Sequence, residues 1–232
     1  MVNYHLETKK RPATVRAEQS EETVCEMPPK KRPKMVLRKV VIRPADFVTS
    51  AFKANGVNIS SLASETEATF LLPTQERIAA YKPDVLLTVR QNNLKELREL
   101  YAAGANLECC NKFGENLISL ACRRGYTDIV EFLIKEAKVS LNVRDDYRRT
   151  PLHDACWTAE PNFEILDLLI REVPAHLILP DVRGFTPFDY VREEHWNKWV
   201  KFLWERKTML RPNEPLLKEE SNESFYEEGS LI

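Results

Sequence analysis

Hydrophobic and polar residues alternate with a helical period only in the middle of the chain. From about residue 80 to 207, apolar residues recur every three or four positions, which predicts a series of short amphipathic helices. Residues 1–45 contain five prolines and little periodic apolar pattern, so we expect a disordered arm. Residues 46–79 read as a partly ordered extension, with one short helix capped by Thr74. Residues 208–232 are polar and acidic, and we expect them to be disordered as well.

The periodic region contains an internal repeat. The predicted helix starts at Pro83, Asn116, Thr150 and Thr186 are 33, 34 and 36 residues apart. Each unit reads as a short helix, a tight turn, a second helix and an extended linker. The four units span approximately residues 80–110, 111–144, 145–180 and 181–207.

Local signals support these helix boundaries. A proline follows both Thr150 and Thr186, which places a capping hydroxyl before a proline at the first helical position. Gly125 can end one helix in the left-handed conformation, and Thr127 can cap the next. The second helices carry Leu133, Leu169 and Leu203 at one recurring place, so we expect these leucines to face neighbouring units.

The units resemble ankyrin repeats, whose signature contains Thr-Pro-Leu-His-x-Ala and a glycine-containing turn. The stretch TPLHDAC at 150–156 carries this signature almost whole, and RGFTPF at 183–188 and GAN at 104–106 carry other parts. The resemblance implies an all-α solenoid of helix-turn-helix units with short hairpin loops. Four units exceed the minimum of about three that such a stack needs to bury a continuous core.

The chain departs from the family pattern at several places. Arg148 stands where the family usually has glycine, so either the turn is adjusted or Arg148 is retained for a contact. The first unit lacks Thr-Pro-Leu-His, and the last has Asp189 in place of histidine. Terminal repeats are expected to be atypical because one of their faces meets water.

The resemblance also implies a partner-binding surface on the hairpin tips and the inner helices, which line a concave groove. Trp157, beside an extended turn, is the residue expected to matter most. Phe113 has an alternative, in which it folds inward against the next hairpin. The predicted partner-binding residues are Phe113, Arg123, Arg124, Tyr147, Arg148, Arg149, Asp154, Trp157, Arg183 and Phe185.

His153 and Cys156 have a spacing that can bind a metal or activate a thiol, but the resemblance favours a structural role. It implies that the histidine ring bridges the Thr150 hydroxyl and neighbouring backbone, and that Cys122 and Cys156 are small buried residues. The sequence contains no glycine-rich phosphate loop, no His-Glu-x-x-His and no Gly-x-Ser-x-Gly. We therefore expect no catalytic residue, no cofactor and no metal.

The two ends of the chain differ in charge. Residues 1–45 carry 11 Lys/Arg against 5 acids, and residues 207–232 carry 3 against 6. A basic cluster between prolines suits a nuclear localisation signal, with an import receptor as partner, and a solvated charge run is the alternative. The arm lacks interleaved aromatic residues, which makes nucleic-acid binding an unlikely use of it. The cluster consists of Lys30, Lys31, Arg32 and Lys34.

No apolar run approaches the roughly 18 residues needed to span a bilayer, and the first residues do not read as a signal or transit peptide. The five cysteines lack disulfide-framework spacing, which fits reduced thiols in the cytosol or nucleus. The sequence thus predicts a non-catalytic protein–protein interaction module, an adaptor or regulatory scaffold. The alternative is a nuclear transcription regulator that uses the basic arm for import or nucleic-acid contact.

Overall fold

The computed structural model describes residues 41–210. The predicted disordered segments outside this range, including the basic cluster around Lys31, lie outside the described residues. Within the range, the regular elements are helices, with an isolated antiparallel bridge between Cys110 and Asn116. The α-helices are α1 (Pro44–Ala54), α2 (Ile59–Glu67), α3 (Gln75–Ala80), α4 (Pro83–Arg90), α5 (Leu94–Ala102), α6 (Leu117–Arg124), α7 (Thr127–Lys135), α8 (Pro151–Cys156), α9 (Phe163–Glu172) and α10 (Trp196–Glu205). The short 3-10 helices are η1 (Pro174–Ile178), η2 (Pro187–Tyr190), η3 (Glu193–His195) and η4 (Lys207–Met209).

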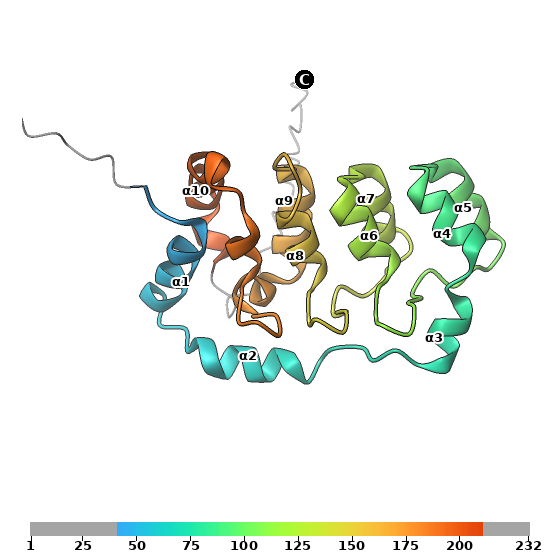
Figure 1. Cartoon of the computed structure of the whole chain (residues 1–232), viewed down its shortest axis with the longest axis horizontal. Helices are drawn as coiled ribbons and strands as arrows, with labels where there is room; N and C mark the ends of the chain where they lie inside the picture. The colour runs from blue at the N-terminus through green and yellow to red at the C-terminus, as the bar shows by residue number, and fades with distance from the viewer. Residues whose placement is uncertain (1–40, 211–232) are drawn as a thin grey trace, which may run out of the picture. The chain divides into compact units, whose positions relative to one another are not determined.

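Four helix-turn-helix units stack side by side, formed by α4 and α5, α6 and α7, α8 and α9, and η2 with α10 (Figure 1). The predicted starts are confirmed, since Pro83 begins α4, and Asn116, Thr150 and Thr186 are the N-caps of α6, α8 and η2. The all-α solenoid predicted from the sequence is therefore the fold of these residues.

The prediction for the turn between α6 and α7 is confirmed at Gly125 and wrong at Thr127. Gly125 ends α6 in the left-handed region, with φ of 72°. The N-cap of α7 is Tyr126, and Thr127 is already the first helical residue. The Thr127 hydroxyl instead accepts a hydrogen bond of 2.9 Å from Nδ2 of Asn162, the N-cap of α9. This side chain therefore links two units.

The core runs continuously through the stack. Leu133, Leu169 and Leu203 are completely buried, as predicted from their recurrence in α7, α9 and α10. In α10, Trp199 and Phe202 are also buried, whereas Trp204 remains 59% exposed. The aromatic residues of this last helix mainly form its packing face, because residues three and four positions apart share one side of a helix.

The N-terminal segment is better ordered than its composition predicts. Helix α1 begins at Pro44, inside the predicted arm of residues 1–45, and both Val48 and Phe52 belong to the core. The segment then runs back along the stack, with α1 against α10, α2 beneath η1, and α3 leading into the first unit (Figure 1). Its helices have 11, 9 and 6 residues, and isolated helices this short are marginal in water, so its order depends on the repeats that it covers.

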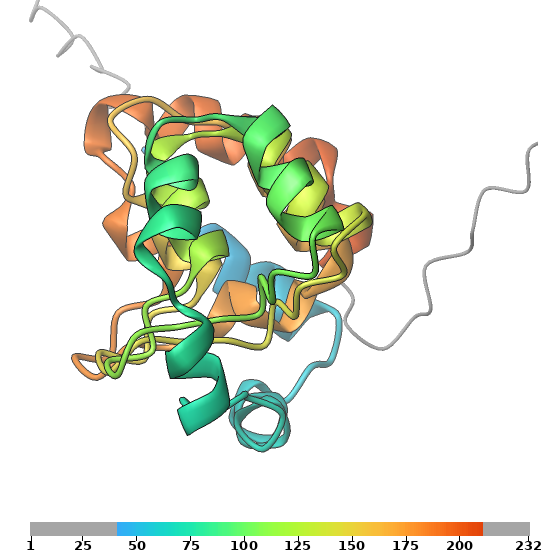
Figure 2. The ribbon, with the colours of Figure 1, turned by 90° about the vertical axis from the view of Figure 1, so that its right-hand side faces the viewer.

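The hairpin tips repeat one backbone geometry, in which the amide of the first residue of each tip donates to the carbonyl of the fifth. Neighbouring tips are joined directly. The amide of Asp146 donates to the carbonyl of Phe113 at 2.8 Å, and the amide of Val182 donates to that of Tyr147 at 3.0 Å. Viewed along the stack, the tips project together to one side, while α2 and α3 lie beneath the loops (Figure 2). The tips are Asn111–Glu115, Asp145–Arg149 and Asp181–Phe185.

The fourth position of each tip is left-handed, with φ of 80° at Gly114, 63° at Arg148 and 84° at Gly184. A Cβ at Gly114 would lie 2.4 Å from the carbonyl oxygen of Arg144, whereas a Cβ at Gly184 would meet no atom within 4 Å. Glycine is thus sterically required at the first tip. At the second, the left-handed backbone of Arg148 costs about 1 kcal/mol.

Candidate functional site

His153 is a structural residue that joins two units. The amide of Thr150 donates to its Nδ1 at 3.1 Å, which leaves the proton on Nε2 to donate to the carbonyl of Phe185 at 3.2 Å. Burial lowers the pKa of His153 to about 4, so the ring is neutral at physiological pH. The bridge to Thr150 and to neighbouring backbone is the arrangement that the resemblance implies.

The two cysteines of the inner helices are packing residues. Cys122 and Cys156 are buried, and burial raises the pKa of each thiol well above its ordinary value. A thiol held in its neutral form is a poor nucleophile and a poor metal ligand. Among residues 41–210, no group of three His, Cys, Asp or Glu side chains could hold a metal ion.

Arginine and aromatic side chains of the last two units form one connected surface cluster around Tyr190. Its ring lies 5.8 Å from that of Trp157 and 6.4 Å from that of Phe185. The Arg149 guanidinium lies over both Tyr147, at 5.1 Å, and Trp157, at 5.5 Å. We call this set the arginine–aromatic cluster. It consists of Tyr147, Arg149, Trp157, Arg183, Phe185 and Tyr190.

Two aspartates at the start of the tips hold the cluster in place. Asp145 binds the Arg149 guanidinium at 2.5 Å. Asp181 is buried and accepts hydrogen bonds from the Tyr190 hydroxyl at 2.5 Å and from two tip amides. Burial acts to raise the pKa of Asp181, but these hydrogen bonds outweigh it and lower the pKa to about 2. The cluster is therefore pre-organised before any partner arrives.

The cluster presents large aromatic surfaces to solvent. Tyr147, Trp157 and Phe185 are 55%, 51% and 46% exposed. Side chains of this size are commonly buried in a monomeric protein, and tryptophan, tyrosine and arginine are the residue types that dominate binding hot spots. Exposed aromatic rings fixed by cation–π contacts are thus suited to bind another surface.

One predicted contact residue is not on the surface. Asp154 in α8 is 2% exposed, and its carboxylate accepts a hydrogen bond of 2.8 Å from Nε of Arg123 in α6. The prediction that Asp154 contacts a partner is wrong, because the first residues of α8 lie between neighbouring inner helices. Burial raises the pKa of Asp154 to about 6, against the opposing effect of Arg123.

Arg123 and Arg124 line a hollow of about 720 Å³ together with the residues that directly follow Trp157 in the chain. The opposite wall is the extended turn between α8 and α9, which replaces the usual short turn. Arg124 is exposed, whereas Arg123 is half-buried by its contact with Asp154. The two predicted arginines therefore line the same hollow.

Phe113 and Arg148, which were also predicted to bind a partner, lie outside the cluster. Phe113 is 49% exposed on its own tip, with the Lys112 ammonium 4.8 Å from its ring, so it does not fold inward against the next hairpin. Arg148 belongs to the other side of the tips, where its guanidinium binds Glu67 of α2 at 2.7 Å. Its backbone turn directs it toward the N-terminal segment and away from the cluster, and its contact with a partner stays a prediction.

Sequence reasoning missed Tyr190, Asp145 and Asp181. The two aspartates stand at equivalent positions, each followed four residues later by a member of the cluster, so their recurrence was a detectable signal. Tyr190 carried no such signal, because its role depends on contacts across two units.

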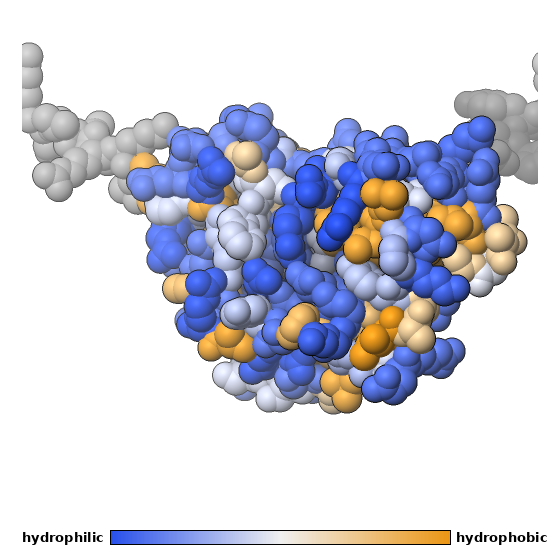
Figure 3. Space-filling model, turned by 45° about the vertical axis from the view of Figure 1, so that its right-hand side comes forward, coloured by the Kyte–Doolittle hydropathy of each residue, from blue (hydrophilic) through white to orange (hydrophobic). Residues whose placement is uncertain are grey.

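The face drawn in Figure 3 is largely hydrophilic, and hydrophobic residues gather there in small separate patches. No helix within residues 41–210 is long and apolar enough to cross a membrane.

Comparisons with known proteins agree with this architecture. A family model described as ankyrin repeats, in three copies, matches residues 85–207. The ankyrin repeat protein YahD of Escherichia coli K12 is 27% identical over 121 residues, which cover 51% of this chain and 60% of that protein. The ankyrin repeat-containing protein F37A4.4 of Caenorhabditis elegans is 42% identical over 48 residues, 21% of this chain and 4% of that protein.

A Caenorhabditis elegans protein named as a glutaminase, glutaminase 2, is 31% identical over 71 residues, which cover 31% of this chain but 12% of that protein. The chain thus spans less than two thirds of each of these relatives, and a match of this extent carries no enzymatic activity over. The family model covers more than half of the chain and coincides with the stacked units described above. The chain belongs to the ankyrin repeat family, whose repeats generally serve in protein–protein interaction.

Proposed function

We propose that this chain is a non-catalytic adaptor or regulatory scaffold that binds a partner protein through the arginine–aromatic cluster and the adjoining hollow. The observation that carries the proposal is the set of three large aromatic side chains that are about half exposed and held by arginines of neighbouring tips. Exposure of these three rings to water contributes nothing to the packing of the core. A partner that covers them gains buried apolar area without having to order them first.

The chemistry of the surface defines the kind of partner. The Arg149 guanidinium is largely occupied by Asp145, whereas Arg124 is exposed and Arg183 remains exposed although it pairs with Asp181 at 3.3 Å. A complementary surface would therefore present apolar or aromatic side chains to the rings and carboxylates to these two arginines.

Alanine at Trp157 is expected to weaken partner capture by at least tenfold while leaving the fold intact, because a central aromatic anchor contributes about 2 kcal/mol or more. The measurement is affinity capture with quantitative mass spectrometry, comparing wild type, Trp157→Ala and Arg123→Ala/Arg124→Ala. Trp204→Ala is the matched control, since Trp204 is an equally exposed tryptophan at the far helix α10. The proposal fails if every partner retained by Trp204→Ala is also retained by the other two variants.

The basic cluster around Lys31 supports a second proposal, nuclear import of the chain with a transcription-regulating role. We expect a fluorescent fusion lacking residues 28–39 to lose nuclear enrichment that the full-length fusion has. Substituting the same residues by an uncharged linker of equal length controls for the change in length. Identical distributions of all three fusions would exclude the import signal.

A further inference from the structure

Helices α2 and α3 pack against the core with partly buried side chains only, among them Ile59 and Leu62 of α2. Neither helix has a fully buried residue, whereas α1 and the inner helices of the repeats have several. Residues 67–71 add a small number of directed contacts with the loops of the second and third units. This is how a bound peptide is held, and we call residues 67–71 the docked segment.

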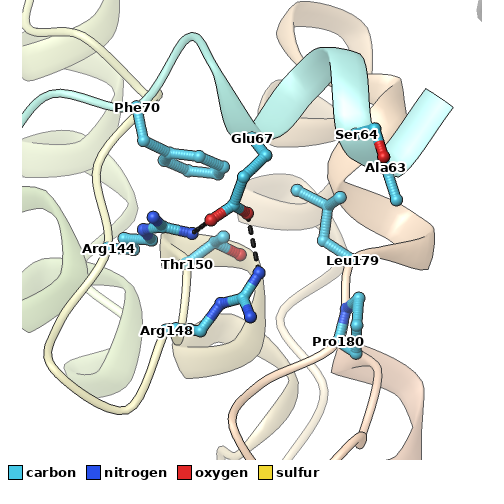
Figure 4. A pocket seen from close by; sticks show the side chains of 9 residues that line it. All are labelled: Ala63, Ser64, Glu67, Phe70, Arg144, Arg148, Thr150, Leu179 and Pro180. Carbon is cyan, nitrogen blue, oxygen red and sulfur yellow. Dashed lines mark hydrogen bonds and ion pairs between the residues drawn. The ribbon is translucent and has the colours of Figure 1, made fainter. Parts of the chain in front are cut away.

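The first contact is electrostatic. The Glu67 carboxylate receives one hydrogen bond from Arg144, at 2.5 Å, and one from Arg148, at 2.7 Å (Figure 4). Each oxygen has its own guanidinium, one from the end of the second unit and one from the tip of the third. Burial would raise the pKa of Glu67, but the two arginines lower it below its ordinary value.

The second contact is aromatic. The Phe70 ring lies 4.7 Å from the Arg144 guanidinium and 5.3 Å from the His176 ring, on which it stacks. His176 is itself buried and fixed by Asn142, whose Oδ1 lies 3.1 Å from its Nε2. The aromatic side chain of the docked segment thus lies against a preformed surface.

The third contact uses the backbone. The Leu71 amide donates to the carbonyl of Asn142 at 2.8 Å, and a cavity of about 150 Å³ remains beside Glu67, Phe70 and Arg148 (Figure 4). Short linear peptides are commonly recognised through such a combination of one main-chain bond, one charged pair and one apolar side chain.

Arg148 supplies independent support for a built anion site. It adopts a left-handed backbone at a position where the two equivalent residues are glycine. The backbone hydrogen bonds of the tip hold this conformation, including that of the Arg148 amide to the Asp145 carbonyl at 2.9 Å, and an arginine here places its guanidinium toward α2. The guanidinium binds the Glu67 carboxylate, and Arg148 itself remains 44% exposed.

The contacts of the docked segment are weak enough to open. Its ion pairs are partly exposed, and no apolar side chain of α2 is fully buried. Segments of this kind open at a free energy well below that of global unfolding, while buried helices open only with the whole fold. The bound state then competes with any external ligand of the same chemistry.

We propose that the loop surface formed by Asn142, Arg144, Arg148 and His176 is a second binding site, for a linear peptide with a carboxylate three residues before an aromatic side chain. The docked segment is its resident, displaceable ligand. A protein that carries such a segment binds here by replacing residues 67–71. This site faces α2 and does not involve the arginine–aromatic cluster, so it stands independently of the groove.

The test is binding in trans of a fluorescent peptide with the sequence of residues 64–72, SETEATFLL, to the full-length chain. The variant Glu67→Ala/Phe70→Ala removes the resident ligand but keeps the site, and we expect it to bind the peptide at least tenfold more tightly than wild type. Adding Arg148→Ala should abolish the gain. A peptide with alanine at its two key positions should not bind, and Trp204→Ala on α10 should leave binding unchanged.

Hydrogen exchange gives a second measurement that needs no variant. In the wild-type chain, amides of residues 59–71 are expected to exchange much faster than those of α6 to α9. The proposal is overturned if these amides exchange as slowly as α8. It is also overturned if a folded Glu67→Ala/Phe70→Ala variant binds the peptide no better than wild type.

Discussion

Replacing Phe52 by alanine is expected to destabilise the fold by about 3–5 kcal/mol, which is typical of removing a fully buried phenylalanine. Phe52 has no exposed surface and lies in the same core as the repeats, although it is 31 residues before Pro83. Helix α1 packs against α10 and η2, so the cavity would open at the end of the stack. Urea unfolding followed by circular dichroism measures the loss.

Phe113→Ala is the matched control for this prediction. Phe113 is half exposed at a tip, and surface substitutions of this kind change stability by roughly 0.5 kcal/mol or less. If Phe52→Ala were no less stable than Phe113→Ala, helix α1 would not belong to the cooperative core. Phe52→Leu retains most of the buried volume and should lie between the two.

Acidification is expected to destabilise the protein between pH 6.5 and pH 4. Burial lowers the pKa of both His153 and His176 to about 4. In this window the unfolded chain binds a proton at each histidine and the folded chain does not, so stability falls as pH falls. Across this window each histidine lowers the free energy of unfolding by about 3 kcal/mol.

Asp154 opposes this effect. Its pKa is raised to about 6, so between pH 6 and its ordinary value near 4 the folded chain binds a proton that the unfolded chain does not, and stability rises as pH falls. The destabilisation from the two histidines exceeds the stabilisation from Asp154. The net decrease in the free energy of unfolding at pH 4 is about 3 kcal/mol. Below pH 4, the low pKa of Asp181 adds a further loss as its carboxylate is protonated.

Two variants separate these contributions in urea titrations at pH 6.5 and pH 4.5. His176→Gln should make the acid-induced loss smaller, and Asp154→Asn should make it larger, because each removes one of the opposing groups. The same acid sensitivity in wild type and both variants would contradict the assignment. A general loss of stability would not change the acid sensitivity of the two variants in opposite directions.

The architecture of the repeats was readable from the sequence because its signals are local. Capping by Asn116 and Thr150 and the left-handed turn at Gly125 each act within a few residues, and the buried leucines recur at one place in each unit. The structural role of His153 followed from the same local motif. Predictions of this kind were confirmed at Asn116, Gly125 and Thr150, whereas the predicted cap at Thr127 was off by one residue.

The candidate site was only partly predictable. Trp157, Tyr147 and Phe185 were identified as exposed aromatic residues, and all three are exposed. Asp154 was assigned to the same surface, yet packing between α6 and α8 buries it against Arg123. A side chain in the first turn of an inner helix can face the groove or the neighbouring helix, and the sequence does not distinguish the two.

By itself, the sequence determined the repeat period, through a signature that recurs along the chain, and most helix starts and packing faces, because these depend on neighbours up to four residues away. Only the tertiary structure decided the path of the N-terminal segment and the role of Arg148. Glu67 lies 77 residues from Arg144 and 81 from Arg148, and the chain shows no periodicity that would pair them. Contacts at such separations arise only once the stacked loops have created a surface on which α2 can dock.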